Sequence, residues 1–437
     1  MSSFRVLPHE RATSSSVKLV PLVTCPHCWE RFPAEEILWI SEHVDLLGDR
    51  LLGPEQQQRF LPSRFSLDGD ALDPRGMICR SLACPRCHLP VPRVMLELEP
   101  LFVSILGAPA SGKSFFLTAM TWQLRALLPA AFGIAFTDAD PGANRVLNEC
   151  EESLFLNPRD SEVMPLGSLI RKTELQGELY DTVAFGQQLV SYPRPFLFVI
   201  QPQAGHPNGG RSADLARMLC LYDNAGEHFQ PGQDTTASPV THHLAHSRAI
   251  LFLFDPTQDK RFRAACHGGR NPEVPAGRDN RLSRQETILN EAAARIRKLQ
   301  GLSHHARYER PLVVVLSKFD EWSHLLGPLE KREPMKKNGE ITGLDVDHVE
   351  ALSRRLRSVL SHYCPETVAA LESFASQVTY IAVSALGHRM QLDPVARLPA
   401  IRPMDVEPYW VTVPLLYALR QVMPGLIPRV RRKVSSV

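Results

Sequence analysis

Short runs of apolar residues recur along the chain, and polar or glycine-containing residues directly follow each one. The clearest runs are Leu101–Leu106, Arg217–Tyr222, Ala249–Phe254, Pro311–Leu316 and Val378–Val383. Uninterrupted apolar runs of roughly four to eight residues are typical of strands buried on both faces, as in a parallel sheet covered by helices. A helical pattern opens at Phe115, and Glu291–Leu299 reads as an amphipathic helix. We therefore predict an α/β domain with a mostly parallel sheet flanked by helices.

The first predicted strand leads into Gly107–Ser114, which reads Gly-Ala-Pro-Ala-Ser-Gly-Lys-Ser and completes the pattern GxxxxGK[ST]. In such a loop, successive backbone N–H groups face phosphate oxygens, and the following helix N-terminus adds partial positive charge. We expect Lys113 to contact the outer phosphates and assist catalysis, and the Ser114 hydroxyl to bind Mg²⁺. The remaining predicted nucleotide contacts in this segment are Gly107, Ala110, Ser111, Gly112 and Phe115.

Two later strands also end in short motifs that suit a nucleotide. Asp223-Asn224-Ala225-Gly226 is a DxxG motif, in which Asp223 would hold the Mg²⁺ shell and the Gly226 N–H would meet the γ-phosphate. Ser317-Lys318-Phe319-Asp320 matches [NT]KxD with serine in the first place. There Asp320 would accept the guanine N1 and N2 protons, a pair that adenine lacks, while the aliphatic stem of Lys318 would cover the base.

The last predicted strand ends in Ser384, Ala385 and Leu386, where a backbone N–H would meet the guanine oxygen. Each short motif alone is weak, but all four occur in order, each at the carboxyl end of an apolar strand. An open α/β sheet binds its ligands at that edge. We therefore predict a site for GTP or GDP with Mg²⁺.

On these motifs, residues 99–423 resemble the P-loop GTPases of the Ras-like, translation-factor class. Within that class the chain is most similar to bacterial double-GTPase-type proteins of conflict or defence systems. The closer likeness rests on an N-terminal cysteine-pair module, the strand Ala249–Phe254 with the following Asp-Pro-Thr, and the terminal segment Val406–Val422. The resemblance implies a regulatory GTP-binding switch, a protein effector or self-association, and GTP hydrolysis.

Several features depart from the simplest GTPases. The segment between the glycine-rich loop and DxxG is long, which predicts an insertion near 139–192, and a basic surface loop is expected at 258–284. The run Pro195–Ile200 is expected to pair with Arg217–Tyr222 through a glycine-rich hairpin. Thr173 and Thr182 are the candidates for the threonine that caps Mg²⁺ in such proteins, and the choice between them stays open.

The residue that would position the attacking water is also unusual. Glu227 stands where many GTPases carry glutamine, and His228 follows it. A carboxylate beside the γ-phosphate replaces an amide poorly, and the sequence assigns no arginine finger. We therefore expect nucleotide binding with slow hydrolysis that a partner stimulates. A scaffold that binds GTP without hydrolysing it is the alternative.

Two Cys-Pro-x-Cys segments precede the nucleotide motifs, Cys25–Cys28 and Cys84–Cys87. Each presents two thiolates on a tight turn, and two such turns can close a tetrahedral Zn²⁺ site made by Cys25, Cys28, Cys84 and Cys87. A site closed by four cysteines leaves no open coordination position, so we expect a structural zinc whose loss lowers stability without changing intrinsic nucleotide affinity.

Other ligands for this zinc stay open, namely His27, His88 and Cys79. A thioredoxin-like redox role is the other interpretation of CxxC, but no βαβ pattern surrounds either pair. The remaining histidines lack metal-ligand spacing and are predicted to lie on the surface or in loops; they include His242, His243, His246, His304 and His305.

The 437 residues, with 44% hydrophobic and 22% charged residues, suit a globular protein of several domains. We divide the chain into an N-terminal tail (1–17), a zinc-ribbon-like module with an insertion (18–98), the GTPase domain (99–423) and a basic C-terminal tail (424–437). The net charge of +2 and the lack of interleaved aromatic and basic residues argue against the remaining alternative, a nucleic-acid-associated GTPase with the zinc ribbon as reader. Without a signal peptide or a bilayer-spanning stretch, we expect a cytoplasmic protein.

Overall fold

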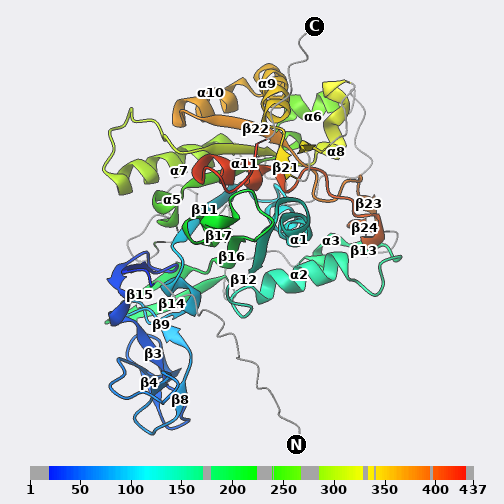
Figure 1. The fold of residues 1–437 in the computed structure, drawn as a ribbon. Helices are drawn as coiled ribbons and strands as arrows, with labels where there is room; N and C mark the ends of the chain where they lie inside the picture. Colours follow the sequence, from blue (N-terminus) through cyan, green and yellow to red (C-terminus); the bar gives the residue numbers. More distant parts are fainter. Residues whose placement is uncertain are drawn as a thin grey trace, which may run out of the picture.

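A seven-stranded sheet forms the centre of the molecule (Figure 1). The computed structural model describes residues 19–170, 179–223, 239, 241–266, 285–327, 333–338, 341–393 and 397–429. In spatial order the strands are β12 (Ile134–Asp138), β16 (Phe196–Pro202), β17 (Arg217–Asp223), β11 (Pro100–Gly107), β18 (Ala249–Phe254), β19 (Leu312–Leu316) and β22 (Val378–Ala382).

The directions of the strands confirm the predicted mixed α/β fold. Strands β17, β11, β18, β19 and β22 run parallel, whereas β16 runs antiparallel to both of its neighbours. The expected pairing of β16 with β17 is therefore present. The connection between them holds a short helix, α4 (Ser212–Leu215), as well as the predicted glycines.

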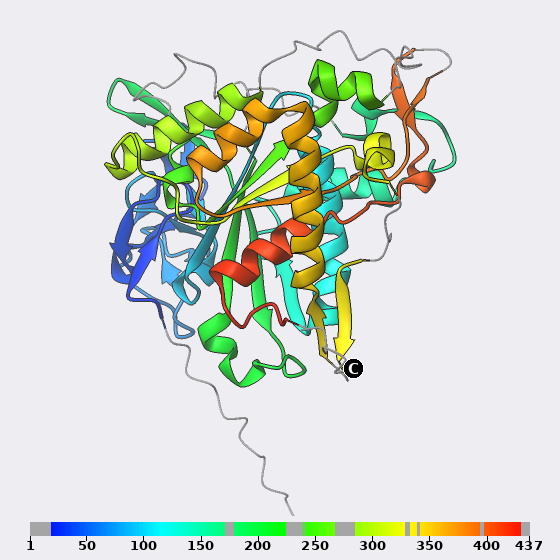
Figure 2. The ribbon, with the colours of Figure 1, turned by 90° about the horizontal axis from the view of Figure 1, so that it is seen from above.

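Helices lie on both sides of this sheet (Figure 2). They include α1 (Lys113–Leu127), α2 (Arg145–Phe155), α7 (Gln285–Gln300), α9 (Val346–Tyr363), α10 (Pro365–Phe374) and α11 (Val413–Val422). Helix α1 packs on α2, and α7 packs on α10. The predicted amphipathic helix is α7, which buries Ile288, Leu289 and Ile296. Such covering explains why the parallel strands read as continuous apolar runs.

The N-terminal part forms a small β module beside the sheet (Figure 1). Its four-stranded sheet has the order β10 (Pro90–Val91), β9 (Leu82–Ala83), β3 (Leu38–Ile40) and β6 (Arg59–Phe60). Three hairpins accompany it: β1 (Leu22–Thr24) with β2 (Arg31–Pro33), β4 (Leu47–Asp49) with β5 (Gly53–Gln57), and β7 (Ala71–Leu72) with β8 (Ile78–Cys79).

The module shares a hydrophobic core with one face of the main sheet. Met218, Cys220 and Tyr222 of β17 belong to that core, whereas Leu219 and Leu221 belong to the main core on the opposite face. This split follows from strand geometry, because successive side chains point to opposite faces. Strand β17 therefore connects the module to the other side of the sheet.

The segment predicted as an insertion contains α2, β13 (Met164–Pro165), α3 (Leu166–Leu169) and a hairpin of β14 (Tyr180–Phe185) and β15 (Gln188–Pro193). The hairpin packs on the N-terminal module, and the Ala184 N–H donates to the Leu51 carbonyl at 2.8 Å. Thr182 lies in this hairpin, so its position lends no support to a role as a magnesium ligand. Thr173 lies outside the described residues.

The predicted loop at 258–284 is wrong in its first part. Residues Lys260–Cys266 form helix α6, because Phe262 and Cys266 stand four positions apart and are both buried. The Phe262 ring packs edge-on against Trp322, with the ring centroids 5.5 Å apart. The sequence is basic and polar around these two residues, which hid the helix.

Candidate functional site

The carboxyl ends of the parallel strands lie level with one another. Ile105 pairs with Asp223, Gly107 with Leu253, and Leu316 with both Phe254 and Ala382. These strand ends, and the described residues that follow them, therefore lie at one edge of the sheet. Strand β11 lies in the middle, between β17 and β18, where strand connections diverge and open α/β sheets form ligand crevices.

The glycine-rich loop owes its shape to close packing and to left-handed backbone. A Cβ on Gly107 would lie 2.6 Å from the Leu253 carbonyl oxygen, so only glycine fits between β11 and β18. Gly112 directly precedes α1 with φ 91°, and Ala110 has φ 59°. The Lys113 ammonium curls back over this loop and donates to the carbonyl oxygens of Gly107 and Ala108 at 2.9 and 3.0 Å.

Asp223 ends strand β17 with a buried carboxyl group. Among the described residues, its Oδ1 has no hydrogen-bond partner, and neither has the buried hydroxyl of Ser111. Burial raises the pKa of Asp223 to about 6, and the positive charge of Lys113 acts in the opposite direction. Buried polar atoms without partners are uncommon in native proteins and often mark a functional site.

The segment after β19 is tied to the glycine-rich loop. The Ser317 hydroxyl donates to the Ser111 carbonyl oxygen at 2.9 Å. Lys318 has left-handed backbone with φ 54°, and its ammonium lies 2.7 Å from a carboxylate oxygen of Asp255. Burial acts against the charged ammonium, but the Asp255 carboxylate outweighs it, so the pKa of Lys318 is raised.

Asp320 and Ser384 lie against each other at the same edge. The Ser384 hydroxyl donates to the Asp320 carboxylate and accepts the Gly387 N–H at 2.7 Å. Burial raises the pKa of Asp320, while the hydrogen bond from Ser384 opposes that rise. A Cβ on Gly387, which has φ 77°, would lie 1.8 Å from the Glu407 carbonyl oxygen, so the turn after Ser384 requires glycine.

Apolar contacts also join the first and last predicted segments. Phe115 and Leu386 are both partly buried against one small cluster, which includes Leu154 and Ile401. Ala385 is half-buried and packs against the main hydrophobic core instead. The structure therefore brings the predicted residues of the described segments to one edge. The predicted Gly226, Glu227 and His228 lie outside the described residues.

Sequence reasoning missed two polar residues that support this edge. Asp255 is buried at the end of β18 and accepts hydrogen bonds from the Thr257 backbone N–H and hydroxyl at 3.0 and 2.6 Å. Gln258 donates to the carbonyl oxygen of Pro109 in the glycine-rich loop at 3.2 Å. An aspartate followed by proline at a strand end was the available signal, because it is typical of a helix N-cap.

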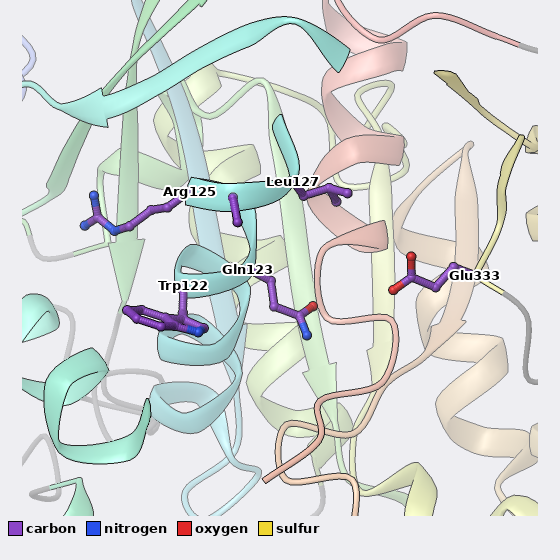
Figure 3. Close-up of a pocket in the computed structure, with 6 residues that line it drawn as sticks. Trp122, Gln123, Arg125, Leu127 and Glu333 are labelled. Carbon is purple, nitrogen blue, oxygen red and sulfur yellow. The ribbon is translucent and has the colours of Figure 1, made fainter. Parts of the chain in front are cut away.

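Among the cavities that the described residues line, two adjoin elements of this edge. One, of about 680 Å³, adjoins the end of β18 and is lined partly by Phe254, Gln258 and Gln285. The other, of about 560 Å³, lies on the C-terminal half of α1 and includes Trp122 and Arg125 (Figure 3). Because an α-helix rises about 1.5 Å per residue, that second pocket lies about 14 Å along α1 from the glycine-rich loop and is separate from it.

The four cysteines of the N-terminal module come together as predicted. Their sulfur atoms all lie within 4.8 Å of one another, with 3.8 Å between Cys25 and Cys87 and 3.7 Å between Cys28 and Cys84. Sulfurs at the corners of a tetrahedron around zinc, with Zn–S about 2.3 Å, would be about 3.8 Å apart. Burial raises the pKa of Cys25, so a cation is needed to hold all four groups as thiolates.

The two Cys-Pro-x-Cys knuckles, Cys25–Cys28 and Cys84–Cys87, continue into backbone of the same shape. Trp29 and His88, the residues after the second cysteine of each pair, have φ of 59° and 60°, and their N–H groups donate to Cys25 and Cys84. The other proposed ligands are engaged elsewhere. His27 contacts the Pro90 carbonyl oxygen at 3.0 Å, and His88 contacts Asp49 at 2.7 Å.

One predicted surface histidine is in fact buried. His243, in the short helix α5 (His243–His246), is fully buried, and its Nδ1 hydrogen-bonds the Ser104 hydroxyl of β11. Its ring stacks on Tyr222 with centroids 4.6 Å apart. The polar neighbours of His243 in the sequence hid this position.

The fold and the cysteine cluster define a mixed α/β protein with a mostly parallel seven-stranded sheet and a candidate Cys₄ metal centre. No protein-family profile matches the chain. Over 238 residues, 54% of this chain, it is 26% identical to SaeC of Mycolicibacterium smegmatis, which is named as a candidate ESX-1 scaffolding and assembly protein. The matched region spans half of that relative's length. Within the described parts of the chain, every helix is too short or too polar to cross a bilayer.

Proposed function

We propose that this chain binds GTP or GDP with Mg²⁺ at the carboxyl ends of β11, β17, β19 and β22, as a nucleotide-dependent regulatory switch. The observation that carries the proposal is the convergence at this edge of three sequence-distant motifs and of Asp223, which begins the fourth motif. The Asp223 carboxyl is buried, and its Oδ1 has no hydrogen-bond partner among the described residues. The strand order adds support. The glycine-rich loop follows the central strand β11, at the point where the chain connects first to strands on one side of β11 and then to strands on the other.

Each predicted contact has a chemical rationale in this arrangement. The Lys113 ammonium, which now caps loop carbonyls, would turn to the phosphates. Ser114 and Asp223 would hold Mg²⁺, which neutralises phosphate charge. Asp320 has its carboxylate fixed by the Ser384 hydroxyl, so it would present its free lone pairs to the guanine N–H groups.

Neighbouring residues would hold the guanine side of the site in place. The ion pair with Asp255 fixes the Lys318 stem, and the bond from Ser317 to the Ser111 carbonyl joins the base-binding segment to the phosphate-binding loop. A site whose polar groups are already oriented loses less entropy when it binds a ligand. We therefore expect tight nucleotide binding and slow GTP hydrolysis, which a partner would accelerate.

A second candidate function is a nucleotide-dependent scaffold that does not hydrolyse GTP. The similarity to a protein named for scaffolding and assembly favours protein partners or self-association. The two candidates differ in turnover. Steady phosphate release from GTP by the purified chain supports the switch, and stable GTP-dependent oligomers without phosphate release support the scaffold.

Titration calorimetry tests the shared claim of both candidates. With Mg²⁺ present, GTP and GDP should bind in the micromolar range or tighter, and ATP at least about tenfold more weakly, the size of effect expected when buried polar groups are left unpaired. Lys113→Ala should abolish binding while the far-ultraviolet circular dichroism stays unchanged. ATP binding equal to GTP binding would reject the guanine assignment, and an unchanged affinity in Lys113→Ala would reject the loop assignment.

A further inference from the structure

The first cysteine knuckle touches the strand that carries Asp223. We infer that Trp29 is a positioning residue for Asp223, acting through Tyr222, so that the N-terminal module forms part of the nucleotide site's support. This inference rests on the proposed function, since it concerns the Mg²⁺ contact of that same site.

Two consecutive hydrogen bonds, both through the Tyr222 hydroxyl, join the knuckle to the strand. The Trp29 indole N–H donates to the Tyr222 hydroxyl oxygen at 3.1 Å, and that hydroxyl donates to the Pro26 carbonyl oxygen. Trp29 is 6% exposed and Tyr222 fully buried. Because Pro26 lies between the first two cysteines, the geometry of the metal centre and the position of the Tyr222 hydroxyl are joined directly.

The two knuckles share their backbone shape but differ in what they contact. His88 pairs with Asp49 inside the module at 2.7 Å. Trp29 stands at the matching position of the first knuckle, yet its side chain leaves the module and reaches the main sheet. The tryptophan is therefore not required by the metal turn, since histidine serves there equally well. It is explained by its contact with Tyr222.

Tyr222 directly precedes Asp223, and the two side chains point to opposite faces of β17. Tyr222 packs in the core shared with the module, while Asp223 faces the side of Lys113. Since Asp223 Oδ1 has no partner among the described residues, its place is set mainly by the backbone of β17. The anchor one residue earlier therefore controls where the carboxylate stands.

The same cluster extends to the strand that carries the glycine-rich loop. Tyr222 stacks on His243, and His243 bonds to Ser104 of β11. Ser104 is paired with Tyr222 across the two strands. The knuckle, the end of β17 and β11 thus form one buried polar and aromatic network, through which a loosened knuckle would displace Asp223 relative to Lys113.

Trp29→Phe removes the indole N–H and keeps an aromatic ring, so it tests this support directly. We expect GTP affinity in Mg²⁺ to fall about five- to tenfold, the effect of one lost buried hydrogen bond. In EDTA, where Asp223 has no ion to hold, the affinity of Trp29→Phe for GTP should stay within about twofold of the wild-type value. Tyr222→Phe, which deletes only the hydroxyl, should behave in the same way and serves if Trp29→Phe does not fold.

His88→Gln is the matched control, because it alters the second knuckle without touching the main sheet. It should leave both affinities unchanged, and zinc content should stay constant in all variants. Equal losses in Mg²⁺ and EDTA, or equal effects of His88→Gln and Trp29→Phe, would overturn the inference and leave the proposed function standing. Absence of GTP binding by the wild type would reject the proposed function and this inference together.

Discussion

Asp223→Asn should make the protein more stable at neutral pH while weakening its Mg²⁺-dependent nucleotide binding. The wild-type carboxylate is buried, and its pKa rises from the ordinary 3.8 to about 6. A difference of that size between the folded and unfolded states corresponds to about 3 kcal/mol against folding once the group is ionised. Asparagine is neutral at every pH and of nearly the same shape, so it avoids this cost.

The protons bound at Asp223 in the folded and unfolded states determine whether stability rises or falls with pH. Between 3.8 and about 6 the folded state binds more protons at Asp223 than the unfolded state, so this group lowers stability as the pH rises. Its cost is fully present above about pH 6. The stability difference between Asp223→Asn and wild type should be about 3 kcal/mol at pH 7.5 and about half of that at pH 5.

Urea unfolding of the nucleotide-free protein, followed by far-ultraviolet circular dichroism at both pH values, measures this difference. Asp214→Asn is the control, because its side chain is 70% exposed, and it should change stability by less than about 0.5 kcal/mol. A destabilised Asp223→Asn, or a gain that does not depend on pH, would refute the reasoning. Either result would mean that another group of the folded protein holds the carboxylate.

Two further substitutions test the turn after β22 and the cysteine centre. Gly387→Ala should destabilise the protein by about 2–4 kcal/mol, because its Cβ would lie 1.8 Å from the Glu407 carbonyl oxygen, whereas Gly167→Ala, which meets nothing within 4 Å, should be neutral or slightly stabilising in urea unfolding. Cys84→Ser should reduce bound zinc, measured by elemental analysis, from about one per chain to well below half, while Cys220→Ser, at a buried cysteine outside the cluster, should keep it. Equal losses of stability in the two glycine variants would contradict the close contact at Gly387. Equal losses of zinc in the two cysteine variants would contradict the Cys₄ metal centre.

The strands of the sheet were predictable because their apolar runs are continuous. Runs such as Leu101–Leu106 and Pro311–Leu316 have few polar interruptions, and buried parallel strands produce that pattern. The loops that follow could be placed at one edge, because parallel strands end together. The cysteine cluster was predictable for a different reason, since two identical Cys-Pro-x-Cys turns have few uses other than closing a metal site.

The contacts between the module and the sheet could not be predicted. Trp29 and Tyr222 are 193 positions apart, and neither belongs to a periodic pattern that indicates a partner. From the sequence, the zinc module reads as independent of the nucleotide site, whereas the structure packs it on β17. His243 was misplaced for a related reason, because only the tertiary contacts with Ser104 and Tyr222 make a polar segment part of the core.

The central claim is that Asp320 recognises guanine, and base exchange at that residue tests it most directly. Asparagine in place of Asp320 replaces one acceptor with a donor, so Asp320→Asn should bind XTP more tightly than GTP, reversing the wild-type order, in calorimetry with Mg²⁺. Asp214→Asn should keep the wild-type preference for GTP. Loss of all nucleotide binding without a gain for XTP, or an unchanged preference for GTP, would contradict the account.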